Sequence, residues 1–439
     1  MDGAEKKIGQ FRQKYPQFAQ TIPMSADLSV LKEEWTAGGI RSHNRIVFQP
    51  MEGCDGTADG APGELTRRRY RRFAQAGAGI IWLEAVAVTQ RGRANPRQLM
   101  LTPSNLPQFR ALVQEIRQVC LQENGFQPLV ILQATHSGRY SKPEGVPAPL
   151  VACHNPLFEG TSPLPEECIL SDEECAVLPA MYAETARLAR ECGFDGIDVK
   201  CCHRYLLSEF LSAYGREGRY GGSFENRTRL YFDCIRAVKS YENEHFFVTT
   251  RLNVYDGFAY PYGFGVREGN GTEPDLSEAE KVISALREEF GIRLVNITVG
   301  NPYVNPHVNR PFYAGPYKNP EHPFVGAERI AAITSALQKR FPDMGLILSG
   351  TSCLRDLSPY YGAGMVAEGG CAFVGFGRMT FAYPQFVRDL FAYGTIDKNK
   401  CCAACSRCSA MMRSGKVAGC PVFDKEVYAP IEKGEGQKG

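Results

Sequence analysis

The sequence lacks any long hydrophobic run. None of its 439 residues fall in a stretch approaching the roughly 18 apolar residues that a membrane-spanning helix needs. The first ten residues, MDGAEKKIGQ, contain neither an apolar core nor a cleavage site, so no secretory signal is visible. These absences predict a cytoplasmic protein that does not bind a membrane.

An excess of charge of either sign is also missing. Lysine and arginine total 50 and aspartate and glutamate total 48, which gives a formal net charge of +2. A chain so nearly balanced gives no reason to expect a nucleic-acid partner. Hydrophobic residues make up 44% and charged residues 22% of the chain, which is the composition of an ordinary globular protein.

A glycine-rich dinucleotide fingerprint is absent after the first predicted strand, which disfavours a doubly wound sheet. Eight short apolar runs instead alternate with helical patterns between about residues 45 and 390, as expected for parallel strands covered on both faces. Eight strand–helix repeats close a barrel, so the fold class is α/β, a (β/α)8 TIM barrel. The apolar runs begin at Arg45, Gly79, Pro128, Gly196, Phe246, Arg293, Gly345 and Cys371.

Two of the helical patterns, LPAMYAETARLARECG and EAEKVISALREEFG, end in glycine, the usual residue at a helix C-terminus. Stretches rich in proline and glycine, from Tyr255 to Pro274 and from Asn301 to Pro323, follow the fifth and sixth predicted strands. We expect both to be long loops. Loops at the C-terminal ends of the strands are where such a barrel builds its site.

Polar residues stand where the apolar strands end. Gln133 ends the third strand, Lys200 the fourth and Arg251 the fifth. Ser349-Gly350-Thr351 follows the seventh strand, and Gly377-Arg378 follows the eighth. Any one of them could be an ordinary strand-end polar group, but together they predict a site on one rim of the barrel.

The last two of these groups favour a phosphate site. Loops after the seventh and eighth strands of a barrel often bind phosphate through backbone N–H groups. Gly350 allows the chain to approach an anion closely, and Arg378 can make a bidentate contact. Arg251 would then hold the negative charge of a reduced ring system. The residues therefore predict a cofactor with a terminal phosphate.

Several longer stretches carry a resemblance to a known family. They are NRIVFQPM from Asn44, LEAVAV from Leu83, QATHSGR from Gln133, HRYLLSEFLS from His203, YGGSFENRTR from Tyr220, TTRLNVYDG from Thr249 and VGFGR from Val374. In this order they resemble the Old Yellow Enzyme family of NADH:flavin oxidoreductases, in its branch with 2,4-dienoyl-CoA reductase and trimethylamine dehydrogenase. The resemblance covers roughly residues 40 to 425.

The resemblance implies that the chain binds FMN. Its implied contacts are of three kinds: a lining of the isoalloxazine ring, hydrogen bonds to the ring edges, and a phosphate site. The ring lining would comprise Pro50, Met51, Glu52 and Ala85; Gln133 would bind the pyrimidine edge and Arg251 would face N1 and O2; Gly350, Thr351, Gly377 and Arg378 would bind the phosphate.

The resemblance also implies an ene-reductase reaction, in which hydride passes from flavin N5 to an activated C=C bond. Tyr205 matches the family's proton donor, and His203 would polarise or orient the substrate carbonyl. A phenol with a pKa of about 10 can still protonate a strongly basic enolate-like carbon. The alternative is that Tyr205 only caps a loop.

Two positions depart from the family pattern. Lys200 replaces the usual first histidine of the substrate-binding pair, and Arg204 replaces the glycine before the tyrosine. The two cations could receive a carboxylate, a phosphate or a developing enolate. Equally, Lys200 could pair with a carboxylate and Arg204 could point into solvent. Tyr303 and His307 are further candidates for substrate contact.

Sixteen cysteines are present, and five of them lie between Cys401 and Cys420. Cys402, Cys405, Cys408 and Cys420 form C-x2-C-x2-C-x11-C before a proline, which suits the four thiolates of a 4Fe-4S cluster. Zinc, which more often binds two separated C-x2-C pairs, and free thiols are the alternatives. The resembling enzymes carry such a cluster after the barrel, with a slightly different spacing that leaves Cys401 as a possible substitute for Cys402.

We therefore expect a barrel at residues 1–395 and a cluster-binding extension at 396–439. Dienoyl-CoA reductase continues into a domain for FAD and NADPH, whereas this sequence stops at Gly439. Electrons are then expected from another protein, such as a ferredoxin, flavodoxin or reductase subunit, or else from NAD(P)H. A homo-oligomer is possible.

Three functions follow from the sequence. An ene-reductase acting on a small unsaturated substrate, with Tyr205 as proton donor, is the first. An oxidative dehydrogenase of the trimethylamine dehydrogenase kind is the second, although two cations would repel an ammonium substrate. The third is a non-catalytic electron-transfer subunit, which the set of Gln133, Arg251 and Gly377-Arg378 disfavours.

Overall fold

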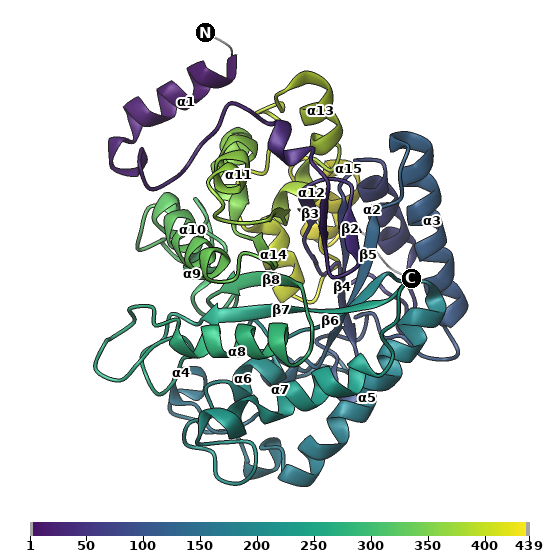
Figure 1. Ribbon diagram of the computed structural model, residues 1–439. Helices are drawn as coiled ribbons and strands as arrows, with labels where there is room; N and C mark the ends of the chain where they lie inside the picture. Colours follow the sequence, from purple (N-terminus) through teal and green to yellow (C-terminus); the bar gives the residue numbers. More distant parts are fainter. Residues whose placement is uncertain (1–2, 436–439) are drawn as a thin grey trace.

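The computed structural model describes residues 3–435 and contains a closed barrel of eight parallel strands (Figure 1). Each strand pairs with its neighbour in chain order, and the last strand closes on the first. This arrangement confirms the predicted TIM barrel. The strands are β3 (Ile46–Phe48), β4 (Ile80–Ala87), β5 (Leu129–Thr135), β6 (Gly196–Val199), β7 (Phe247–Tyr255), β8 (Leu294–Val299), β9 (Gly345–Leu348) and β10 (Phe373–Phe376).

All eight strands lie within or across the apolar runs predicted from the sequence. They are buried almost throughout, because helices cover the outside of the barrel and side chains fill its interior. The longer helices are α1 (Gly3–Lys14), α2 (Glu64–Ala74), α3 (Leu106–Asn124), α5 (Asp172–Cys192), α7 (Phe224–Lys239), α8 (Ser277–Glu288), α10 (Pro323–Arg340), α11 (Ser358–Ala367) and α13 (Phe386–Tyr393).

Shorter helices lie in the connections at the barrel rim and in the C-terminal extension. Those of the connections are α4 (Pro156–Glu159), α6 (Leu206–Phe210), α9 (Pro306–Asn309) and α12 (Arg378–Ala382), with 3-10 turns at Pro16–Phe18, Ser29–Leu31, Gln90–Gly92, Gly138–Tyr140, Glu166–Cys168 and Thr351–Leu357. The extension contributes α14 (Arg407–Arg413) and α15 (Lys425–Lys433).

Helix α5 ends at the predicted glycine but begins at Asp172, ahead of the pattern's first residue, Leu178. Ser171 and Glu174 form a reciprocal capping box at its start, and Gly193 caps its end in the left-handed conformation. The prediction for the end of α8 was less accurate. That helix ends at Glu288 with Glu289 as its C-cap, and Gly291 follows with a φ of 66°.

A hairpin of β1 (Trp35–Ala37) and β2 (Ile40–Ser42) precedes the barrel and was not predicted. Its two turn residues, Gly38 and Gly39, have φ values of 57° and 82°, as a tight hairpin turn requires. Trp35 contacts Phe373 with ring centroids 5.0 Å apart. The hairpin thereby packs against a buried apolar cluster of barrel residues that includes Val47, Trp82 and Ile131.

Above this apolar cluster the barrel interior becomes polar. Trp82 donates through Nε1 to Asp198 Oδ2 at 2.9 Å, and Gln49 and Asn296 exchange two hydrogen bonds of 3.1 and 2.8 Å. These buried groups satisfy one another, as buried polar groups must. They form a polar layer beneath the C-terminal ends of the strands.

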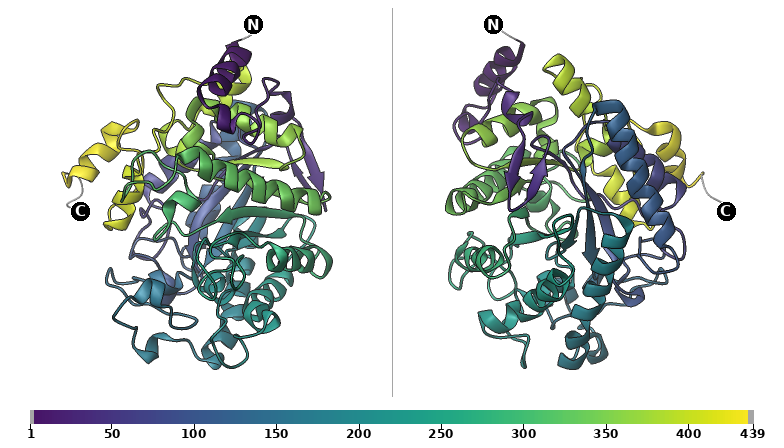
Figure 2. Two further views of the ribbon diagram at one scale, coloured as in Figure 1. Left: turned by 90° about the vertical axis from the view of Figure 1, so that its left-hand side faces the viewer. Right: turned by 45° about the vertical axis from the view of Figure 1, so that its right-hand side comes forward.

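The extension lies against α2 at the edge of the barrel (Figure 2). Asp424, just before α15, accepts hydrogen bonds from Arg68 at 2.8 and 2.9 Å and forms an ion pair with Arg72. The extension has its own small apolar cluster of Met411, Val417, Tyr428 and Ile431.

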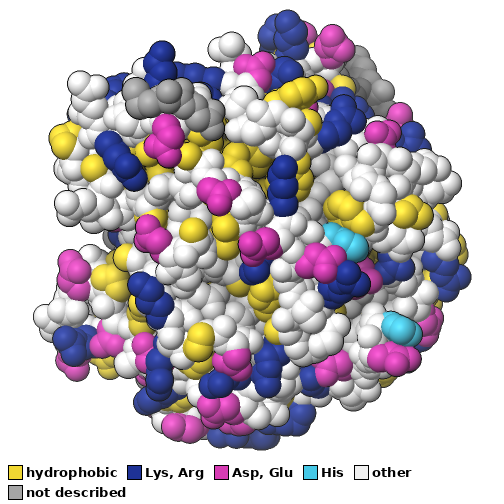
Figure 3. All heavy atoms as spheres, turned by 45° about the horizontal axis from the view of Figure 1, so that its top comes forward, with side chains coloured by type: hydrophobic (Ala, Val, Ile, Leu, Met, Phe, Trp, Pro, Cys, Tyr) yellow, Lys and Arg dark blue, Asp and Glu magenta, His cyan; other side chains and the backbone are white. Residues whose placement is uncertain are grey.

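Charged side chains of both signs are interspersed over the face shown in Figure 3, in keeping with the small net charge of the chain. Within residues 3–435, no helix combines the length and the apolar character needed to cross a membrane.

Candidate active site at the barrel rim

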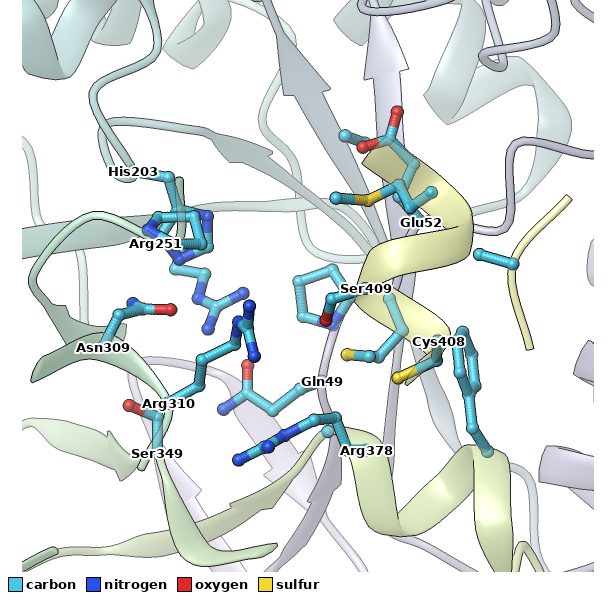
Figure 4. Close-up of a pocket in the computed structure, with 18 of the residues that line it drawn as sticks. Gln49, Glu52, His203, Arg251, Asn309, Arg310, Ser349, Arg378, Cys408 and Ser409 are labelled. Atoms are coloured by element: carbon cyan, nitrogen blue, oxygen red, sulfur yellow. The ribbon is translucent and has the colours of Figure 1, made fainter. Parts of the chain in front are cut away.

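A deep pocket opens at the C-terminal ends of the strands, where TIM barrels place their sites. It encloses about 1010 Å³, part of which is open to solvent. Every barrel strand contributes to it, either directly or through the loop that follows the strand, together with α14 of the extension (Figure 4). Of the residues singled out from the sequence, the pocket lining contains Pro50, Met51, Glu52, Ala85, Gln133, Lys200, His203, Tyr205, Arg251, Tyr303, Gly350, Gly377 and Arg378.

Asp198 organises the floor of this pocket. Its Oδ2 accepts from Gln133 Nε2 at 2.6 Å, and its Oδ1 accepts from the backbone N–H of Arg251 at 2.6 Å. Burial raises the pKa of Asp198 to about 6, while these hydrogen bonds act in the opposite direction. Because Nε2 of Gln133 is engaged below, its carbonyl oxygen remains available to a ligand.

Arg251 is buried in the pocket wall, and its Nε has no hydrogen-bond partner among the described residues. Burial lowers the pKa of its guanidinium. An uncompensated buried cation is expensive. The site therefore suits a ligand that brings carbonyl oxygens or negative charge to this wall.

Two more arginines line the same pocket. Arg378 donates through Nη2 to the Pro311 carbonyl at 2.8 Å, and Arg310 donates through Nη1 to Ser406 Oγ at 3.0 Å. Burial and the charge of Arg378 lower the pKa of Arg310 to about 9. Two adjacent buried cations need an anion between or beside them.

Unpartnered groups beside these arginines fit a phosphate. Among the described residues, neither Nη1 of Arg378 nor the buried hydroxyl of Ser349 has a partner. Gly350 has a φ of 76°, and a Cβ on it would lie 2.5 Å from Ile330 Cδ1, so the close turn of this loop requires glycine. Ser349, named above only as a strand-end residue, lines the pocket, as do Ser352 and Arg310, which the sequence did not indicate.

Arg310 could have been found only as one cation within the long loop after β8, because its place beside Arg378 depends on how that loop folds. Thr351, in contrast, was expected at the phosphate but does not line the pocket. Its hydroxyl donates to the Gly375 carbonyl at 3.1 Å, which ties the loop after β9 to β10.

The three residues of the expected reacting end lie together. His203 has a φ of 64° and is partly buried, and its buried Nε2 lacks a partner within the described chain. Burial and then the charges of Arg251 and Lys200 hold the pKa of His203 well below its usual value, so its imidazole is neutral. The Lys200 ammonium lies 3.6 Å from the centroid of the Tyr205 ring, a close cation–π contact.

Burial lowers the pKa of Lys200, while the charge of Glu52 opposes that effect. Glu52 reaches the same pocket from the end of β3 and accepts from Asn95 Nδ2 at 3.3 Å. Burial raises the pKa of Glu52, and the charge of Lys200 lowers it. The Lys200 side chain therefore lies among the substrate-side groups, near Tyr205 and within the electrostatic influence of Glu52.

Arg204 does not reach this pocket, so the expectation that it receives substrate is wrong. Its Nη1 donates to Asp256 Oδ2 at 3.1 Å and also bonds Ser212, and the residue is 2% exposed. Its φ of 57° turns the side chain away from Tyr205 and into the loop after β7. His307 also lies outside the lining, and its Nδ1 contacts the Tyr317 hydroxyl at 2.6 Å.

The four cysteines of the C-x2-C-x2-C-x11-C pattern line a second, smaller cavity of about 310 Å³. The Ala404 and Phe423 backbone N–H groups donate to the sulfurs of Cys402 and Cys420, each at 3.4 Å. Cys401 lies outside this lining, and its thiol donates to the Asp397 carbonyl at 3.3 Å. Ala404 and Ser406 have φ values of 48° and 59°, which bend the chain around the cavity.

The model of the NADH:flavin oxidoreductase / NADH oxidase family matches residues 36–290. The chain belongs to this family. It is thus a flavin-dependent oxidoreductase of the Old Yellow Enzyme family, for which membership implies FMN, and the cationic pocket described above fits that cofactor.

Curated relatives agree with the family. The NADPH dehydrogenase of Geobacillus thermodenitrificans is 31% identical over 245 residues, 55% of this chain and 67% of that protein. The NADPH dehydrogenase of Bacillus pumilus is 28% identical over 340 residues, 74% of this chain and 91% of that protein.

Solved structures share the fold. A 2-naphthoyl-CoA reductase complex superposes with a TM-score of 0.72 at 19% identity, over 90% of this chain and 57% of that one. Histamine dehydrogenase from Rhizobium sp. 4-9 gives 0.67 at 18% identity, over 91% of this chain and 53% of that one. The chain thus spans little more than half the length of these two proteins. The old yellow enzyme homologue from Zymomonas mobilis gives 0.61 at 20% identity, over 84% of this chain and 94% of that one.

Proposed function

We propose that this protein is an FMN- and 4Fe-4S-dependent ene-reductase that reduces an activated C=C bond, with Tyr205 as the proton donor. One observation carries the proposal: a buried phenol faces a cationic pocket, with the Lys200 ammonium 3.6 Å from its ring centroid. A cation in that position favours the phenolate that remains after proton donation. A tyrosine that only capped a loop would have no need of it.

Bound FMN would supply hydride from its N5 to the β-carbon of the substrate. Gln133 and Arg251 are the groups that would hold the oxygen-bearing edge of its ring, and Ser349, Arg310 and Arg378 those that would hold its phosphate. Pro50, Met51 and Ala85 would line the ring. These assignments give the unpartnered groups of Arg251, Ser349 and Arg378 a contact of matching chemistry and leave His203 Nε2 for the substrate.

The remaining groups would act on the substrate. His203 is neutral and has a free Nε2, so it can donate one hydrogen bond to a carbonyl oxygen. Lys200 would stabilise the negative charge that develops on that oxygen, since such electrostatic stabilisation is strongest in a site shielded from water. Tyr205 would then protonate the α-carbon.

We further propose that Cys402, Cys405, Cys408 and Cys420 hold a four-iron cluster in an extension spanning 396–439, of which 436–439 lie outside the described residues, while 1–395 form the barrel unit. Two observations support a cluster over zinc. The four thiols surround one cavity, yet within residues 3–435 no group of three or more His, Cys, Asp or Glu side chains is spaced for a single metal ion. A cubane separates its ligand sulfurs more widely than one tetrahedral ion does.

Electrons would enter through this cluster from a separate donor protein. Cys408, Arg378 and Phe381 line both the cysteine cavity and the large pocket, so the two cofactor sites would share a wall. Cys405, Cys408 and Cys420 are only partly buried, which leaves the cluster site near the surface. Full turnover of the purified protein with NAD(P)H alone would contradict a separate donor.

Oxidation of an amine substrate is the competing proposal, in keeping with the second function considered from the sequence. The pocket opposes it, because Lys200, Arg251 and Arg310 would repel an ammonium group. An enone or enoate, whose oxygen gains negative charge during reduction, benefits from the same cations.

A single anaerobic experiment tests these proposals. The purified protein is assayed for FMN, iron and sulfide. It is then reduced with dithionite, separated from the excess dithionite, and mixed with 2-cyclohexenone or cinnamate. We expect about four irons per chain and reoxidation of the flavin by the unsaturated compound. Tyr205→Phe should slow that reoxidation by about 100-fold or more.

Tyr393→Phe is the matched control, since Tyr393 is 77% exposed and lines neither cofactor pocket. Reduction of the oxidised protein by trimethylamine, with no reoxidation by any unsaturated compound, would favour amine oxidation instead. A colourless protein that contains zinc would overturn both cofactor assignments.

A further inference from the structure

A second tyrosine contacts the proposed proton donor. The Tyr303 hydroxyl lies 2.9 Å from the Tyr205 hydroxyl, and the two residues are 98 positions apart in the chain. Tyr303 comes from the long loop after β8 and lines the same pocket. The Tyr303 hydroxyl makes no other hydrogen bond within the described part of the chain. Its remaining hydrogen-bonding capacity is therefore available to a ligand in the pocket.

Counting protons shows what this pair can do. Burial raises the pKa of both phenols, so both are protonated at neutral pH. Two hydroxyl protons are then present for one oxygen–oxygen hydrogen bond. The second proton is free to point into the pocket, towards the place a substrate would occupy.

The surroundings make the two tyrosines unequal. Lys200 lies 3.6 Å from the centroid of the Tyr205 ring, whereas the cation nearest the Tyr303 ring is Arg413, at 5.8 Å from its centroid. Coulombic stabilisation of a phenolate falls with distance. Once Tyr205 has lost its proton, Lys200 therefore stabilises the phenolate directly, and the Tyr303 hydroxyl is the group placed to donate to it.

Tyr303 is held in this position by a local network. Asn301 accepts from the Tyr303 backbone N–H at 2.7 Å through Oδ1 and donates to the Tyr140 hydroxyl at 2.8 Å through Nδ2. The Tyr140 ring stacks on the Tyr303 ring with centroids 3.9 Å apart. Arg413 of α14 also donates to the Pro302 carbonyl, next to Tyr303.

The other titratable or charged groups near the pair come from four elements. Glu52 and Cys54 follow β3, Lys200 ends β6, Tyr140 belongs to the 3-10 turn after β5, and Arg413 belongs to α14. The charge of Glu52 raises the pKa of both phenols, so it opposes formation of a phenolate rather than promoting it.

We propose that Tyr303 is a positioning residue that donates a hydrogen bond to Tyr205 and returns its proton after turnover. This inference rests on the proposed ene-reductase function. Tyr205 O–H breaks as the α-carbon C–H bond forms, which leaves a phenolate at Tyr205. Tyr303 passes its own proton to that phenolate and is reprotonated by solvent water at the half-buried side of its ring. No electrons move in these steps.

The test uses the holoprotein with a ring-fluorinated tyrosine at position 205, whose titration is followed by fluorine NMR. In Tyr303→Phe the phenolate loses a hydrogen-bond donor, so its titration should move to higher pH by about one pH unit. Protonation of the product from 2-cyclohexenone, measured in single turnover, should slow by about 10-fold to 100-fold.

Tyr313→Phe is the matched control, because it removes a phenol hydroxyl from the same loop after β8 without touching the Tyr205 pair, and Tyr313 is 47% exposed. It should leave both the titration and the rate near wild type. A titration that stays in place or moves to lower pH in Tyr303→Phe would overturn the inference, since Tyr205 would then be the donor in the pair. The NMR titration decides this even if 2-cyclohexenone is not reduced, an outcome that would count against the proposed function alone.

Discussion

At the scale of single residues, Arg204 shows how the backbone direction decides the role of a charged side chain. Its φ of 57° costs about 1–2 kcal/mol for a residue with a Cβ. The buried ion pair with Asp256 accompanies this strain, and Asp256 also accepts from the Phe264 N–H at 2.9 Å. We conclude that Arg204 supports the loop after β7.

Replacing this arginine by glycine tests that conclusion. Arg204→Gly relieves the backbone strain but leaves the Asp256 carboxylate buried without its partner. We expect the free energy of unfolding to fall by about 2–4 kcal/mol in urea denaturation, while kcat of the folded enzyme changes little. A large loss of kcat without any loss of stability would contradict this conclusion and indicate that Arg204 acts on the substrate.

His136 makes the stability of the fold depend on pH. It is 3% exposed, its Nδ1 accepts from the Gly138 N–H at 3.1 Å, and burial lowers its pKa from 6.5 to about 4. Between about pH 6.5 and pH 4, His136 therefore binds a proton in the unfolded chain but not in the native state. This contribution is complete above about pH 6.5 and is lost as the pH falls towards 4.

We expect the histidine to account for up to about 3 kcal/mol of the loss of unfolding free energy over that interval. His136→Asn keeps an acceptor for the Gly138 N–H but cannot titrate. Urea denaturation of both proteins at several pH values gives the difference, in which the carboxylates common to both cancel. Parallel pH profiles for the two proteins would contradict the assignment.

At the scale of elements, the loop from Cys401 to Cys420 is bent so that adjacent cysteines have opposite surroundings. Cys402 faces the cysteine cavity, and Cys401 lies against the Asp397 carbonyl. The sequence left either one as the first cluster ligand. The direction of their side chains favours Cys402.

This pair provides its own matched control. Cys402→Ser should reduce the iron and sulfide content of the anaerobically purified protein severely, because serine is a poor ligand for iron–sulfur clusters. Cys401→Ser should retain about four irons per chain. Iron lost from Cys401→Ser and kept by Cys402→Ser would reverse the assignment.

At the scale of the whole molecule, the uncompensated arginines of the pocket couple folding to ligand binding. Arg251, Arg310 and Arg378 converge on one buried space without enough protein partners. A ligand that binds only the native state stabilises it in proportion to the logarithm of its concentration. An anionic ligand should do this most strongly here.

Thermal unfolding of the flavin-depleted protein measures this coupling. FMN at 100 times its Kd should add about 2.7 kcal/mol to the free energy of unfolding. Riboflavin, which has no phosphate, should raise the Tm much less at the same concentration, because Arg310 and Arg378 keep their unpaired charge. Equal shifts for the two compounds would place the phosphate elsewhere.

The barrel and the outline of its site could be predicted because they depend on local order along the chain. An apolar run followed by a polar residue defines a buried strand and its C-terminal end, and eight such runs place Gln133, Lys200, Arg251 and Arg378 on one rim. The hairpin before the barrel could not be predicted, because its three-residue strands are too short to show an alternation of apolar and polar residues.

By itself, the sequence determined the fold class, the family and the spacing of the four cysteines, because each depends on patterns among residues that are close together in the chain. Only the tertiary structure decided that Arg204 turns away from the pocket, that Arg310 joins Arg378, and that Tyr303 meets Tyr205. The physical reason is the same in each case: these contacts depend on backbone angles and loop paths that bring together residues distant in the chain.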